Sequence, residues 1–267
     1  MSYLRSLGLA ALALVVLVAP SPAVAGTEAE EPPTPTVLEA TPKEVERLIA
    51  AAEKANAEKD DKYLSRVLIS MGERRDKAFA PVIKKAMGHK KSKVQALAIR
   101  AAASNQMEGE TKRVLKLLKA SKKKKKAKKK GGGDVSGYVT AAAIDFLARL
   151  AIEGAEEQVV YHLNRLFLVE TRVSASYAPD LIRAAVHYLG QMKTMSAVPR
   201  LVDMLGEPQA NPSDPNNPPA TYWEARYELW HASEGWVRWA LQEITGQKYR
   251  SQREWKAWAA ANEKKFK

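Results

Sequence analysis

The four histidines are the residues best suited to acid–base or metal chemistry, and their spacing favours neither. His89, His162, His187 and His231 fall in different predicted segments, and no two lie within one helical turn of each other. The chain also lacks His-Glu-x-x-His, Gly-x-Ser-x-Gly, a phosphate-binding glycine loop and any cysteine. We therefore predict a protein that is not an enzyme and holds no metal or cofactor, with each histidine a surface or groove residue.

Two features keep a chemical role open. His187 follows Arg183 by one helical turn, so we expect it to share the exposed face of that arginine. An enzyme would need carboxylates that meet across neighbouring helices, and the residues that could do so are Asp145, Asp180, Asp203 and Glu243.

A run of lysines between residues 122 and 130 could bind a polyanion. The chain has a net charge of +13; removing a leader whose only charge is Arg5 leaves +12, and the run accounts for all but +4 of that. Its members are Lys122, Lys123, Lys124, Lys125, Lys126, Lys128, Lys129 and Lys130. Such a run suits an anionic envelope polymer or lipid headgroups. It is also typical of a solvated loop, and Gly131 to Gly133 favour a hinge there.

The elements that must position these residues follow from one repeated apolar template. Counted from its first residue, the template has apolar residues at positions zero, three, four and seven, which line one side of a helix. It occurs over 94–101, 139–146, 182–189 and 237–244. The starts are 45, 43 and 55 residues apart, near the ~40 to 47 residue period of paired-helix repeats. The recurrence predicts an all-α chain of stacked helix pairs.

Two other segments match each other in register. Residues 80–88 read Ala-Pro-Val-Ile-Lys-Lys-Ala-Met-Gly, and residues 198–206 read Val-Pro-Arg-Leu-Val-Asp-Met-Leu-Gly. Proline is tolerated in the first turn of a helix, and glycine often ends a helix in a left-handed cap. Each segment is therefore predicted as a short helix that starts near its proline and ends at its glycine.

The sequence of residues 182–205 resembles the HEAT-repeat signature. It reads Ile-Arg-Ala-Ala-Val-His-Tyr-Leu-Gly, then a short turn, then Ala-Val-Pro-Arg-Leu-Val-Asp-Met-Leu; Val237, Arg238, Ala240 and Ile244 are similar to the second helix again. The resemblance covers 180–206, with weaker matches over 78–104 and 235–246. It implies an armadillo-like α-α superhelix, a solenoid of antiparallel helix pairs whose concave face usually binds protein. An irregular helical bundle with chance similarity is the alternative.

The residues one position after each template start should form a row along the second helices. They are Gln95, Thr140, Arg183 and Arg238, and the family prefers arginine at this position. With His187 they make up the predicted partner-binding groove of a non-catalytic scaffold. We expect a protein partner, and export argues against nucleic acid.

The N-terminus resembles a secretory signal peptide. Arg5 precedes an almost wholly apolar stretch from Leu7 to Val18, and small residues lead to Ala25. The apolar core is shorter than the ~20 residues of a membrane-spanning helix, although an anchor is the alternative. We expect cleavage after Ala25, export to the periplasm or beyond, and no transmembrane segment in the mature chain. Residues 26–42 are predicted to be a disordered proline-rich, acidic linker.

The remaining chain divides into three predicted parts. Residues 43–206 contain the repeats, with an N-terminal cap over 43–73 that starts at Thr41 and Pro42, and with a lysine-rich loop over 121–134. A proline-rich loop covers 207–220. Residues 221–267 form a C-terminal repeat and cap that hold all six tryptophans, which are Trp223, Trp230, Trp236, Trp239, Trp255 and Trp258. An aromatic ligand platform is the other interpretation of these tryptophans.

Overall fold

The computed structural model describes residues 36–123, 136–167, 175–211, 213 and 217–266. These residues confirm an all-α chain. The helices are α1 (Pro42–Ala57), α2 (Asp61–Glu73), α3 (Ala80–Ala86), α4 (Ser92–Ser104), α5 (Thr111–Lys123), α6 (Gly137–Arg149), α7 (Glu156–Leu166), α9 (Ala178–Gln191), α10 (Val198–Met204), α11 (Ala220–Thr245) and α12 (Gln252–Ala261). Short 3-10 helices are Lys77–Phe79, Glu108–Glu110, Met195–Ala197 and Glu263–Phe266. None of the described helices is both long and apolar enough to cross a bilayer.

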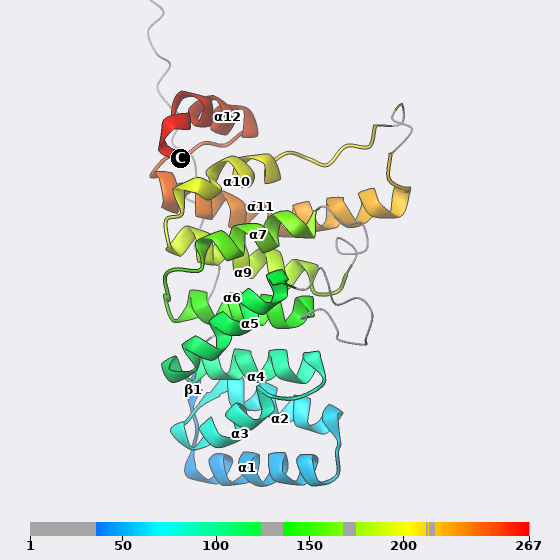
Figure 1. Ribbon diagram of the computed structural model, residues 1–267, viewed down its shortest axis with the longest axis vertical. Helices are drawn as coiled ribbons and strands as arrows, with labels where there is room; N and C mark the ends of the chain where they lie inside the picture. The colour runs from blue at the N-terminus through cyan, green and yellow to red at the C-terminus, as the bar shows by residue number, and fades with distance from the viewer. Residues whose placement is uncertain (1–35, 124–135, 168–174, 212, 214–216, 267) are drawn as a thin grey trace, which may run out of the picture.

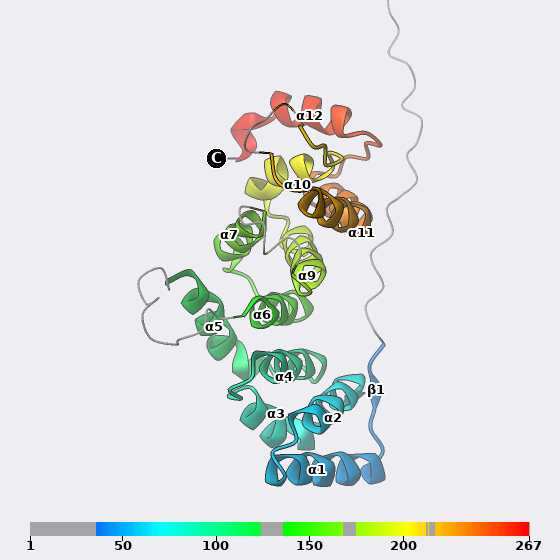
Figure 2. The ribbon, with the colours of Figure 1, turned by 90° about the vertical axis from the view of Figure 1, so that its right-hand side faces the viewer.

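The helices lie in two columns along the long axis (Figure 1). Figure 2 shows α3, α5, α7 and α10 on one side, and α2, α4, α6, α9 and α11 on the other. Each of α4, α6, α9 and α11 packs on the helix before it in its own column and on one helix of the opposite column. The second column is bowed, with α6 set back from α2 and α11 (Figure 2).

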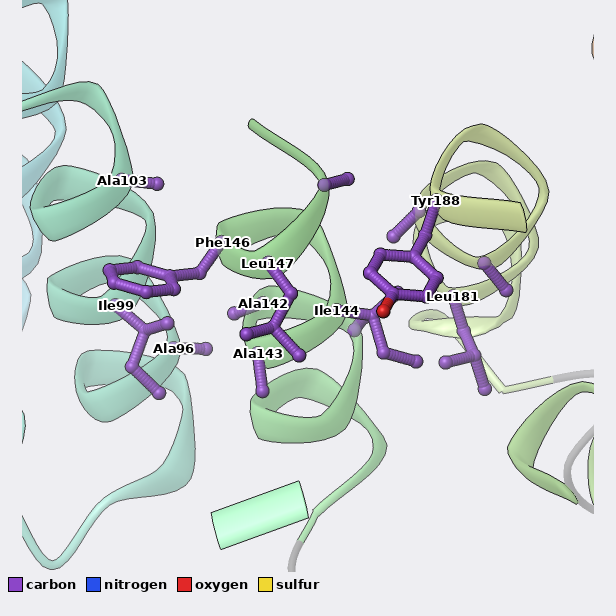
Figure 3. Close-up of a cluster of buried hydrophobic side chains, with 14 of the residues drawn as sticks. Ala96, Ile99, Ala103, Ala142, Ala143, Ile144, Phe146, Leu147, Leu181 and Tyr188 are labelled. Carbon is purple, nitrogen blue, oxygen red and sulfur yellow. The ribbon is translucent and has the colours of Figure 1, made fainter. Parts of the chain in front are cut away.

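The apolar template forms the contacts within the second column. Its four starting residues are almost completely buried, with exposed fractions of 2% for Val94, 1% for Val139, 1% for Ile182 and 0% for Val237. On α6, Phe146 points toward Ile99 of α4, whereas side chains on the opposite side of α6 face α9 (Figure 3). The template therefore predicted the buried faces correctly, and α6 is covered by a helix on each side within the column.

The turns that leave α4, α6 and α9 share one local conformation. Gln106, Ala151 and Lys193 follow α4, α6 and α9 and have positive φ angles of 52°, 50° and 47°. In each turn the next amide donates to the carbonyl five residues earlier, as in Met107 N to Ala102 O at 3.0 Å. This is the 6→1 bond of a Schellman cap. Its recurrence gives consecutive helix pairs the same entry into the following 3-10 or α-helix.

A buried tyrosine ties one pair to the next. The hydroxyl of Tyr188, in α9, donates to the carbonyl of Ile152 at 3.0 Å and accepts from the amide of Ala155 at 3.1 Å. Burial raises the pKa of this hydroxyl to about 12. Tyr188 thus anchors the α6–α7 turn on α9 as a neutral hydrogen-bonding group.

The predicted start of the N-terminal cap is confirmed. Thr41 is the N-cap of α1, Pro42 is in the first turn, and Glu44 completes a capping box in which its carboxylate accepts from the Thr41 amide at 2.9 Å. The end of the predicted linker differs, because Leu38–Glu39 (β1) pairs in parallel with Arg74–Arg75 (β2). The predicted signal peptide and residues 26–35 of the linker lie outside the described residues.

Two further boundary predictions were wrong or incomplete. Gly88 and Gly206 do follow α3 and α10 closely, but neither adopts the left-handed cap, which Gly246 takes after α11 with φ 69°. Helix α5 runs on to Lys123, two residues into the lysine run, while 124–135 lie outside the described residues. The described part of the proline-rich loop is irregular up to Ala220, as predicted.

Candidate functional site

The exposed side of the second column carries a network of arginines and aspartates. Helix α6 packs against α4, α9 and α5, so only its fourth side is open, and that side presents Asp145 and Arg149. Neighbouring helices add Arg100 from α4, and Asp180 and Arg183 from α9. We call these five residues the second-helix face.

One ion pair crosses this face from α4 to α9. The Arg100 guanidinium donates to the Asp180 carboxylate at 2.7 Å, although the two residues are 80 positions apart and α6 lies between their helices. Arg183, one turn after Asp180, approaches the other oxygen of that carboxylate at only 3.7 Å. Its side chain is 49% exposed, more than either of the other two. Arg183 is therefore the most accessible cation of the network.

A second set of contacts links α2, α4 and α6. Arg149 pairs with Asp145 at 3.0 Å and also reaches the Ser104 hydroxyl at 3.5 Å. The Ser104 carbonyl accepts from Nε of Arg75, which follows α2, at 3.3 Å. With Arg75 included, four arginines face two aspartates. The network is therefore held in place by its own ion pairs and still carries an excess of positive charge.

The structure separates the five residues that were predicted to line one groove. Arg183 is exposed, as predicted. Gln95 instead donates to the Met87 carbonyl at 2.9 Å and closes the end of α3. Arg238 bonds to Glu234 at 3.2 Å and to the Arg250 carbonyl, so it fastens α11 to the segment before α12. These two side chains donate to backbone carbonyls at a helix end and in a turn. The predicted continuous row therefore does not form.

Thr140 and His187 correct the groove prediction more strongly, because both are buried. Thr140 is 4% exposed, since α6 is covered on three sides. His187 is 8% exposed and lies under two rings of α11, with centroid distances of 5.9 Å to Trp236 and 5.5 Å to Trp239. It follows Arg183 by one turn as predicted, but the tryptophans cover it.

The other histidines and carboxylates do not converge on a reaction centre. His162 is buried beside Tyr161, contrary to the surface position predicted for it, and His89 contacts Asp61 at 3.2 Å. Asp145 and Asp180 each pair with an arginine. Within the described ranges no group of three or more His, Asp or Glu side chains is placed to hold a metal ion.

A basic stripe on α5 leads into the lysine run. Lys112, Lys116 and Lys119 are exposed at a spacing that places them on one side of the helix. The buried residues of the same helix, Val114 and Leu118, face the core. Lys122 and Lys123 end the helix, and Lys124 to Lys130 lie outside the described residues. The helical spacing of these three lysines in the sequence could have predicted the stripe. Only the lysine run that follows it was predicted.

Comparisons with known proteins identify no family or curated relative for this chain. No family model matches the chain, and no curated protein matches it significantly.

Proposed function

We propose that this chain is a HEAT-like α-solenoid that acts as a non-catalytic scaffold of the cell envelope and binds a protein partner through its second-helix face. The observation that carries the proposal is the ion-pair network spanning α4, α6 and α9. The buried template, the alternation of two columns and the recurring left-handed turns support the solenoid. The signal-like N-terminus of the sequence supports the envelope location.

The second-helix face favours a partner with an acidic segment. The three helices that carry this face, α4, α6 and α9, follow one another along the bowed column (Figure 2), so side chains from several helices could contact one partner. Ion pairs hold Arg100 and Arg149 in place, so these side chains lose little conformational entropy on binding. Arg183 is half exposed, and its ion pair with Asp180, at 3.7 Å, is long. A carboxylate of the partner is expected to bind the free edge of this guanidinium.

The direct test is the charge reversal Arg183→Glu. The mature chain from residue 26 is used to capture partners from an envelope fraction, and the affinity of the captured protein is then measured by titration calorimetry. We expect Arg183→Glu to weaken binding at least tenfold, about 1.4 kcal/mol, because it places a carboxylate opposite the acidic segment. The melting temperature should change little, since Arg183 is half exposed.

The matched control is Arg253→Glu, which reverses an exposed arginine on α12, outside the second-helix face. It changes the net charge by the same amount and should leave the affinity as it is. Equal affinities for wild type and Arg183→Glu would refute this face as the binding surface. Equal losses in both variants would instead show that only the overall charge matters.

A second candidate function is attachment to an anionic surface through the lysine run. The basic stripe on α5 favours it, because Lys112, Lys116 and Lys119 extend the same positive charge along an ordered helix. Each basic residue that reaches an anionic membrane contributes about 1 kcal/mol. A run of eight lysines therefore needs only a few contacts to hold the chain at such a surface.

Replacing residues 122–130 with a neutral Gly/Ser segment of equal length tests this second function. Binding to phosphatidylglycerol vesicles is measured at 50 and 200 mM salt, with zwitterionic vesicles as the control. Wild type should lose affinity steeply as salt rises, and the variant should bind at least about tenfold more weakly at low salt, the effect of two engaged lysines. Unchanged binding to anionic vesicles would rule out the run as the attachment site.

A further inference from the structure

The first helices of the stack surround a pocket of about 420 Å³ at its N-terminal end (Figure 1). The pocket lies between the turn that joins α1 to α2 and the loop that joins α3 to α4. Its apolar lining comes from the buried residues Ala55, Leu64 and Ala86. The volume is within the range of about 300–1,000 Å³ that is typical of small-molecule sites. None of the lining residues belongs to the second-helix face.

Four lysines from three segments line this pocket. Lys59 lies in the turn after α1, Lys85 is in the last turn of α3, and Lys90 and Lys91 directly precede α4. All four residues are exposed, so their ammonium groups keep their charge. Lys59, Lys85 and Lys90 have no ion pair with any residue that the structure describes. The pocket thus gathers three cations that no carboxylate of the described chain neutralises.

Among the described residues one carboxylate lines the pocket, and it already has partners. Asp61 pairs with the ammonium group of Lys91 and contacts Nε2 of His89 at 3.2 Å. The hydrogen bond from Lys91 lowers the pKa of Asp61, so this carboxyl group is ionised at neutral pH. Nδ1 of His89 accepts from the Lys91 amide at 3.1 Å, so the ring proton lies on Nε2 and the imidazole is neutral. Four lysines and one aspartate give the lining a net charge of +3.

We propose that this pocket binds a small molecule that carries two phosphate groups. Each phosphate monoester has a charge of about −1.5 to −2 at neutral pH, so two such groups match the charge of the lining. Carboxylates carry a single charge each, and three of them would have to fit in the same volume. The carbon skeleton that joins the phosphates would lie over Ala55, Leu64 and Ala86. The site is independent of the second-helix face and of the lysine run.

Calorimetric titration of the mature chain with fructose bisphosphate tests the site, with fructose monophosphate and citrate as comparison ligands at constant ionic strength. We expect the bisphosphate to bind at least about tenfold more tightly than either of the others. The double variant Lys85→Gln, Lys90→Gln should weaken the bisphosphate at least about tenfold, because it removes two of the unpaired cations. The matched control is Lys256→Gln, Lys264→Gln, which removes two exposed lysines at the other end of the stack and should bind as wild type does.

Asp61→Asn separates ligand binding from a structural role. This variant removes the carboxylate that competes for Lys91, so we expect the bisphosphate to bind at least about threefold more tightly. The melting temperature should fall, since Lys91 and His89 lose their partner. A purely structural cluster would show the lower melting temperature without the gain in affinity, and that result would overturn the site.

The lysine run is excluded as the source of binding by the chain in which a neutral Gly/Ser segment replaces residues 122–130. This chain should bind fructose bisphosphate as wild type does. Loss of binding there, or equal losses in the two double lysine variants, would refute the pocket. In the same chain, competition by vesicles that contain phosphatidic acid would identify a lipid headgroup as the source of the phosphates, and absence of competition a soluble ester.

Discussion

Phe146→Ala is expected to lower the free energy of unfolding by about 3–5 kcal/mol, the range for deleting a buried phenylalanine. Phe146 is completely buried and points from α6 toward Ile99 and Ala103 of α4 (Figure 3). The alanines around it on both helices are too short to fill the space that the ring would leave. The cavity would open at the middle of the second column, where α6 holds the two halves of the chain together.

Urea denaturation monitored by circular dichroism measures this loss. Tyr227→Ala is the control, because Tyr227 is 46% exposed on α11 and its removal should cost well under about 1 kcal/mol. A second transition in the Phe146→Ala curve would indicate that the helices before and after α6 unfold separately, as expected of a stack held mainly by nearest-neighbour contacts. A loss no larger than that of Tyr227→Ala would contradict the packing of α4 on α6.

The buried faces could be predicted from the sequence because they depend on local periodicity. Of the sixteen template positions all but Leu97, which is half-buried, are buried. The start of α1 at Thr41 and Pro42 could also be predicted from the sequence, because a capping box and a proline act within one helical turn. The left-handed turns were missed because Gln106, Ala151 and Lys193 are not glycines. A 6→1 backbone hydrogen bond closes each turn and holds its residue in a conformation that the residue type does not favour.

The candidate site was harder to predict because it depends on what covers each helix. Thr140 and Arg183 occupy equivalent positions in the template, yet the first is buried and the second is exposed. His187 has the spacing of an exposed neighbour of Arg183 but lies under tryptophans that come about 50 residues later in the chain. The pair Arg100 and Asp180 joins two helices that are not adjacent in the column. Contacts of this range leave no local pattern in a single sequence.

The six tryptophans of the C-terminal part fall into two groups with different surroundings. Trp239 and Trp255 are buried, and Trp236 and Trp258 are partly buried against the core, which favours a cap over a ligand platform for these four. Trp223 and Trp230 lie in the first half of α11, and each indole donates a hydrogen bond, Trp223 to the Asn217 side chain at 3.0 Å and Trp230 to the Leu205 carbonyl. The tryptophans in the second half of α11 therefore pack against the core, whereas those in the first half bond to residues that precede α11 in the chain.

Trp255 fixes the last helix on the stack. It is completely buried in α12, and its ring meets Tyr249 edge to face at a centroid distance of 5.0 Å. The Gln252 side chain, one turn earlier, donates to the Val202 carbonyl of α10 at 3.0 Å. Helix α12 therefore covers α10, whose apolar side would otherwise face solvent at the end of the first column.

Trp255→Ala is expected to cost about 3–5 kcal/mol in the stability of this end of the chain, because an entire indole is removed from a closed site. Hydrogen exchange locates the effect: amides of α12 and α10 should lose protection, while those of α4 and α6 keep theirs. Trp223→Ala, at a half-buried ring, is the control and should change protection little. If Trp255 belonged to a ligand platform, its removal would leave protection of α12 unchanged, and the cap would be refuted.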